Sequence, residues 1–159
     1  MVLRALKSGP AFVLAVALAA GPAASQEDFR TYTKRASYDD VKFELSNAIT
    51  ERGLAVDLNG QVGEMLDRTG ADVGSTKKIY THSEFFAFCS AKLSRAAMEA
   101  DPSNIGLCPY VVFMYEAADK PGEVVVGYRH PTQRGSEASK KAIAEIDALL
   151  DGIAKDAVK

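Results

Sequence analysis

The chain is 159 residues long, carries a formal charge of −2, and is 47% hydrophobic and 25% charged. This length suits one domain with one buried core. Nucleic-acid binding is not expected, because phosphate contacts need clustered lysine and arginine and the acidic chain has no such stripe. Neither a Gly-x-Ser-x-Gly motif, a phosphate loop nor a dinucleotide fingerprint occurs, so no common enzyme class is indicated.

The start of the chain is typical of a secretory signal. Arg4 and Lys7 precede an uncharged, almost wholly apolar run over residues 11–20, and the small residues Ala23 and Ser25 precede a cut after Ser25. The apolar run is too short for a spanning helix, which needs about 20 residues. No cysteine follows it for lipid attachment.

We therefore predict a cleavable signal peptide over residues 1–25 and a single α+β domain over residues 26–159. Loss of Arg4 and Lys7 changes the formal charge of the chain from −2 to −4. The expected location is the periplasm, without a lipid anchor and without membrane contact after cleavage.

The first half of this domain predicts two strands and two helices. Residues 29–36 alternate loosely in polarity and suggest a strand. Ser37, followed by Asp40, resembles a capping box and opens a helix that ends near Arg52, before Gly53. Its apolar face combines Val41, Leu45, Ala48 and Ile49. A short strand over 54–58 should close at an Asn59-Gly60 turn, and a short helix follows over 62–70.

The second half predicts three strands and two helices. The longest strand candidate covers 78–89, and a helix over 91–100, with Leu93, Ala96, Ala97 and Met98 inside, ends at Asp101-Pro102. Residues 107–116 are apolar on both faces, which favours a central strand. A turn at Lys120-Pro121-Gly122 joins it to an antiparallel partner over 123–128. A long amphipathic helix covers 137–158.

This order predicts an α+β fold with a single, mainly antiparallel sheet and helices packed on one face. The other face of such a sheet needs a cover. We expect a second copy to supply it, so that the protein is a homodimer.

Three segments between His82 and Pro131 are distinctive: FFAFCSAKLSRAAMEADP from Phe85, LCPYVVFMYE from Leu107 and VVVGYRHP from Val124. In these segments the chain resembles the domain of unknown function 302 family. The resemblance implies a compact fold similar to TATA-binding-type folds, often dimeric, with no established activity. Common members have Leu-Pro-Cys at the central strand, whereas this chain has Leu107-Cys108-Pro109. A shift by one residue turns the cysteine to the other face.

The two cysteines, Cys89 and Cys108, leave one predicted strand and enter the next. In an oxidising compartment they suit a structural disulfide, which needs Cα atoms about 4.4–6.8 Å apart. A redox or sulfur-transfer thiol pair is the alternative, although the Cys-x-x-Cys spacing is absent. Two unrelated free thiols are the third possibility.

The two histidines, His82 and His130, could serve a haem or metal carrier. The paired ligand spacing of a closed zinc site is absent, and so is the Cys-x-x-Cys-His motif of covalent haem. In an unbroken strand His82 and Cys89 face opposite sides. We therefore expect no cofactor, with haem or metal as the alternative.

Two groups of residues are candidate ligand contacts. Arg129, His130 and Arg134 form a predicted cationic cluster after the last strand. His82 and Glu84 share a strand face with Tyr80, Phe86 and Phe88 and could pair as acid and base. The first interpretation is a periplasmic small-ligand-binding or accessory protein whose small-molecule or protein partner is unknown. The alternatives are the thiol component using Cys89 and Cys108 and the haem or metal carrier.

Overall fold

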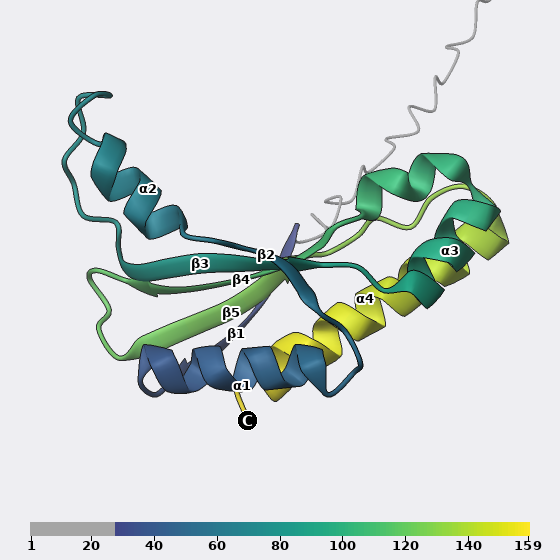
Figure 1. The fold of residues 1–159 in the computed structure, drawn as a ribbon, viewed down its shortest axis with the longest axis horizontal. Coiled ribbons are helices and arrows are strands. Elements are labelled where there is room, and N and C mark those ends of the chain that lie inside the picture. Colours follow the sequence, from purple (N-terminus) through teal and green to yellow (C-terminus); the bar gives the residue numbers. More distant parts are fainter. Residues whose placement is uncertain (1–27) are drawn as a thin grey trace, which may run out of the picture.

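The structure, a computed structural model, describes residues 28–159 (Figure 1). The predicted signal peptide over residues 1–25 lies outside the described residues. Within the described part of the chain, no helix is both long and apolar enough to cross a membrane.

Five strands form one antiparallel sheet in the order β1-β5-β4-β3-β2. They are β1 (Phe29–Arg35), β2 (Val56–Gly60), β3 (Tyr80–Phe88), β4 (Tyr110–Ala117) and β5 (Glu123–Arg129). The α+β class and the central place of β4 are confirmed, as is the β4–β5 hairpin. β1 and β2 are the two edge strands of the sheet.

Helices α1 (Tyr38–Thr50) and α4 (Glu137–Asp156) cover one face of the sheet, here called the inner face (Figure 1). Helix α3 (Ala91–Ala100) packs against α4, and a 3-10 helix, η1 (Pro102–Leu107), follows it. Serine hydroxyls cap these three α-helices at Ser37, Ser90 and Ser136, each accepting from the backbone N–H three residues on.

Helix α2 (Val62–Thr69) is an exception to the prediction that the helices share one face. Figure 1 shows it on the side of the sheet opposite α1 and α4. It follows β2 after a single residue, Gln61, and then packs along β3. The chain between β2 and β3 therefore stays at the edge of the sheet.

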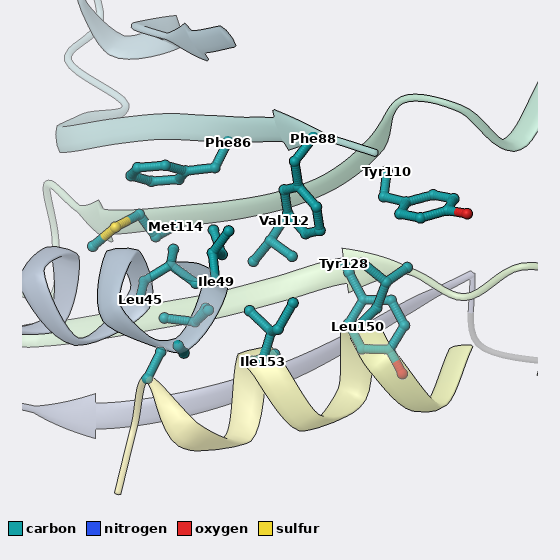
Figure 2. Close-up of a cluster of buried hydrophobic side chains, with 14 of the residues drawn as sticks. Leu45, Ile49, Phe86, Phe88, Tyr110, Val112, Met114, Tyr128, Leu150 and Ile153 are labelled. Atoms are coloured by element: carbon teal, nitrogen blue, oxygen red, sulfur yellow. The ribbon is translucent and has the colours of Figure 1, made fainter. Parts of the chain in front are cut away.

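The core lies between the inner face and the two long helices (Figure 2). Alternate strand residues supply it, because successive side chains of a strand point to opposite faces. From the strands come Phe86, Phe88, Val112, Met114 and Tyr128, and from the helices Leu45, Ile49, Leu150 and Ile153, all at most 4% exposed. The opposite, outer face carries the half-buried Phe85, Phe113 and Tyr115.

Three predicted details are wrong. Asn59 and Gly60 belong to β2, where they pair with Phe86 and Phe85, and do not form a turn. Tyr80 does not share a face with His82, because the register of β3 shifts between these two residues and places Tyr80 beside Tyr115. Ala96 is exposed on α3, so only Ala97 of that helix is fully buried.

Candidate functional site

A cavity of about 170 Å³ opens at the edge of β3, between α1 and α2. We call it the Glu84 pocket. Its lining includes Tyr38, Lys42, Gln61, His82, Ser83 and Glu84. It combines His82 and Glu84, two residues predicted from the sequence, with residues from α1 and from the start of α2 that were not predicted.

The pocket exists because β2 is shorter than its neighbour. β2 pairs only with the stretch of β3 from Phe85 to Phe88. Beyond it, α2 packs against this part of β3 from the outer side of the sheet (Figure 1). Gly63 makes this approach possible, since a Cβ there would lie 3.1 Å from Ser83 Oγ and 3.3 Å from the Ser83 backbone nitrogen.

The Glu84 carboxylate forms the floor of the pocket and is only 3% exposed. Its Oε2 atom lies 2.9 Å from Lys42 Nζ and accepts hydrogen bonds from Asn59 Nδ2 at 2.7 Å and Gln61 Nε2 at 3.0 Å. Burial by itself would raise the pKa of Glu84, but these three donors outweigh burial and hold the pKa below its usual value. Glu84 is therefore ionised at neutral pH.

The polar atoms around the cavity are not all satisfied within residues 28–159. The three donors Lys42, Asn59 and Gln61 all contact Oε2 of Glu84, not Oε1. The hydroxyls of Tyr38 and Ser83 are buried and make no hydrogen bond of normal geometry in this part of the chain, although the Tyr38 hydroxyl lies close to the Glu84 carboxylate. Buried polar groups normally have partners, so such a cluster marks a place where a ligand or water can bind.

Tyr38 closes one side of the pocket. Burial raises the pKa of its hydroxyl, and the negative charge of Glu84 and a hydrogen-bonding contact with that carboxylate raise it further, so this group stays protonated and can donate. Its ring stacks on the imidazole of the exposed His82, with ring centroids 4.7 Å apart. The stack places one aromatic wall beside the carboxylate.

The lining of the pocket is predominantly acidic. Asp39, Glu64 and Asp67 lie around it together with Glu84, whereas Lys42 is the one lysine of the lining. Lys78 approaches Asp67 from outside, with Nζ 2.6 Å from Oδ2. An anionic site with an ionised acceptor on its floor favours a positively charged ligand.

The predicted cationic cluster of Arg129, His130 and Arg134 does not share one set of contacts. The Arg129 guanidinium lies over the Phe29 ring, 5.3 Å from its centroid. His130 Nδ1 lies 2.7 Å from Asp147 Oδ1 on α4, and Tyr128 Oη donates to the same oxygen at 3.1 Å. Arg134 instead lies near Asp101, where its positive charge helps to lower the pKa of that carboxyl group.

Cys89 and Cys108 form a disulfide, with Cα atoms 6.2 Å apart. It joins the residue after β3 to the start of the segment that enters β4, as the disulfide interpretation predicted. Neither cysteine of the described chain is free, and the redox alternative gains no support from the structure.

The histidines lie at opposite ends of the sheet. His82 is near the start of β3, and His130 follows the end of β5. Residues 28–159 contain no group of three or more His, Cys, Asp or Glu side chains that could hold a metal ion.

Comparison with known proteins agrees with this architecture. Residues 29–157 match the family described as "Domain of unknown function DUF302". The chain belongs to the DUF302 family. The structure is also similar to the crystal structure of an uncharacterized conserved DUF302 protein from Bacillus stearothermophilus, with a TM-score of 0.68 and 15% sequence identity, over 84% of this chain and 100% of that one. Among curated proteins no relative matches.

At this identity the Bacillus stearothermophilus DUF302 protein shows the fold alone. The sequence comparison with the family confirms the suspected membership, and the fold class is confirmed with it. Since the family carries no assigned function, the chemistry of the Glu84 pocket has to be argued from this chain's own residues.

Proposed function

We propose that this DUF302 protein binds a small ligand with a primary ammonium group in the Glu84 pocket. The observation that carries the proposal is the ionised, 3% exposed carboxylate of Glu84, whose donors Lys42, Asn59 and Gln61 all contact Oε2. An ammonium group donates up to three hydrogen bonds and compensates the surplus negative charge of the lining.

The hydroxyls of Tyr38 and Ser83 supply the second half of the recognition. The Ser83 hydroxyl is buried without a partner in the described chain, and the Tyr38 hydroxyl is held in its protonated form next to Glu84. A ligand hydroxyl or carbonyl a few bonds from the ammonium group would satisfy them. A buried hydroxyl without a partner costs about 1–3 kcal/mol, so satisfying it favours binding.

The size of the cavity limits the ligand. About 170 Å³ corresponds to roughly five or six non-hydrogen atoms, at about 30 Å³ for each water-sized group. Small amino alcohols fit this range, and ethanolamine is the simplest probe that carries both groups.

The test is an NMR titration of the full chain with ethanolamine and, separately, with acetate, a small anion. We expect ethanolamine to shift resonances of Tyr38, His82 and Ser83, and acetate to leave them in place. Glu84→Gln keeps the side-chain size and removes the charge, and should weaken ethanolamine binding at least tenfold. Tyr38→Phe should weaken it several-fold.

Glu44→Gln is the matched control, since Glu44 is exposed on α1 and lies outside the pocket lining. It should change the affinity less than twofold. Equal binding of acetate and ethanolamine, or unchanged affinity in Glu84→Gln, would contradict the proposal.

We also propose that the domain works in the periplasm after removal of residues 1–25. The charged start, the short apolar run and the small residues before position 26 support this. Mass spectrometry of the protein from a native periplasmic fraction should give a chain that starts at Gln26. An intact Met1 start in a membrane fraction would count against it.

A second copy, we propose, covers the outer face of the sheet. This face exposes 46% of Phe29 and 38% of Val111, and aromatic contacts link Phe29 to Phe113 and Phe113 to Tyr115. Size-exclusion chromatography with light scattering should give a dimer that Phe113→Arg dissociates. Phe43→Arg is the control, because Phe43 is 64% exposed on α1, away from this face. A wild-type protein that is monomeric at every concentration would contradict the proposed dimer.

A further inference from the structure

A second cavity, of about 200 Å³, lies at the other end of the sheet. We call it the Arg129 pocket. Its walls come from the segment that leads from η1 into β4, from the end of β5 and from α4. The close-up of the core labels Tyr110 and Leu150 of this wall, on the same side of the view as the buried Tyr128 (Figure 2).

The lining of this cavity is the chemical opposite of the Glu84 pocket. Leu107, Pro109, Val111, Ile146 and Leu150 supply an apolar wall, and no carboxylate lies in it. Tyr110 turns its hydroxyl away to Ser94, with the two oxygens 2.9 Å apart. Arg129 is therefore the charged group that the cavity offers to a ligand.

The Arg129 guanidinium is available for an anion. Arg30, Arg35, Arg52 and Arg95 each pair with a carboxylate. Arg129 makes no ion pair or side-chain hydrogen bond with residues 28–159, and instead lies over the Phe29 ring. Stacking on an aromatic ring occupies the face of a guanidinium and leaves the N–H groups at its edge free to donate.

From this geometry we infer a binding site for a small apolar monocarboxylate. The carboxylate accepts two parallel hydrogen bonds from the edge of Arg129, the geometry for which a guanidinium is best suited. The apolar part of the ligand fills the cavity between Leu107, Ile146 and Leu150. The volume accommodates roughly six or seven non-hydrogen atoms by the same water-sized measure, which is enough for a five-carbon chain whose carboxylate lies at Arg129. This site is independent of the Glu84 pocket and prefers the opposite charge.

Isothermal titration of the full chain with hexanoate, 1-hexanol and hexylamine tests the site, because the three probes share one chain length and differ in charge. We expect hexanoate to bind at least tenfold more tightly than 1-hexanol, and hexylamine more weakly still at this site. Amide resonances of Val111 and Ile146 should shift with hexanoate, whereas those of Ser83 should not.

Variants locate the charge contact. Arg129→Gln should remove the preference for hexanoate over 1-hexanol, and Arg129→Lys, which keeps the charge but loses the paired geometry, should retain part of it. Arg134→Gln makes the same charge change on a residue outside the lining and should alter affinity less than twofold. Arg129 is exposed, so these variants should keep the wild-type melting temperature within a few degrees.

Two results would overturn the inference. One is hexanoate binding to Arg129→Gln as tightly as to the wild type. The other is equal affinity for hexanoate and 1-hexanol in the wild type, which would mark a purely apolar cavity.

Discussion

The start and the end of β3 are stabilised by different means. At the start, the Glu84 end, β2 no longer covers the edge, and a buried carboxylate is compensated by Lys42, Asn59 and Gln61. At the other, the disulfide end, Cys89 and Cys108 tie β3 to the approach of β4 beside an apolar cavity. At the Glu84 end, the open edge of β3 lets polar side chains such as Lys42 and Gln61 reach a buried carboxylate. At the disulfide end, a covalent bond and an apolar cavity wall take the place of that polar network.

The largest effect should come from breaking the disulfide end. Cys89→Ser with Cys108→Ser removes a cross-link over a sequence separation of 19 residues, which stabilises by about 3 kcal/mol in the chain-entropy model. Urea unfolding should show this loss. Hydrogen exchange should accelerate in η1, whereas the amides of α2 should change only through the global loss of stability.

Reduction of the wild-type protein with dithiothreitol is the control and should reproduce the double variant. If hydrogen exchange accelerates as much in α2 as in η1, the disulfide end and the Glu84 end do not behave as separate units.

A smaller effect should follow at the Glu84 end. Glu84→Gln removes the charge that Lys42, Asn59 and Gln61 compensate, and should cost about 1–2 kcal/mol at neutral pH, discounted because Lys42 is partly exposed. Urea unfolding of both proteins gives the difference. A variant as stable as the wild type would mean that the carboxylate is not stabilising.

The pH dependence of that difference gives a sharper test. The folded-state pKa of Glu84 is depressed, so its contribution is fully present above the unfolded value of about 4.3 and is lost as pH falls through the lower folded value. The wild-type advantage over Glu84→Gln should therefore be constant near neutral pH and vanish in acid. The lowered pKa values of Asp101, Asp151 and Asp156 act in both proteins and cancel. If the stability difference between the wild type and Glu84→Gln grows as pH falls, the folded-state pKa of Glu84 is raised instead of lowered, which would contradict the ionised carboxylate.

The smallest loss of stability is expected from removing the N-terminal caps of two helices. Ser37→Ala removes the cap of α1, which carries Tyr38 and Lys42, and Ser90→Ala removes the cap of α3 at the disulfide end. Each should cost about 1 kcal/mol, with the larger loss at Ser37, whose hydroxyl accepts at 3.1 Å compared with 3.4 Å for Ser90. Only Ser37→Ala should also weaken ethanolamine binding. Equal weakening by Ser90→Ala would show that the effect is global.

Local patterns in the sequence predicted much of the fold. The apolar stripes of α1 and α4, the cap at Ser37 and the turn before β5 are encoded within a few residues of one another, which makes them readable. Tyr80 was assigned to the wrong face because a register shift inserts one residue, and nothing in the local alternation reveals it.

The candidate sites depend on pairings that are distant in the sequence. Glu84 could be suspected, but its partner Lys42 lies on another element, beside an apolar stripe that hides its role. The predicted cluster after β5 is divided between two sets of contacts for a simple reason. Arg129 and His130 are neighbours, so their side chains point to opposite faces, one to Phe29 and the other to Asp147.

The edge position of β1 has a consequence for how copies of the protein can meet. An edge strand offers unpaired backbone groups to which another strand can add. β1 carries Lys34, and a lysine on an edge strand opposes such pairing, because two such edges would bring like charges together. Arg30 and Arg35 of the same strand already pair with carboxylates of their own molecule. Growth of the sheet from one molecule into the next is thus opposed at Lys34, as is aggregation by that route. The proposed association through the outer face avoids this penalty, because it stacks one sheet on another and leaves the backbone edge of β1 unpaired.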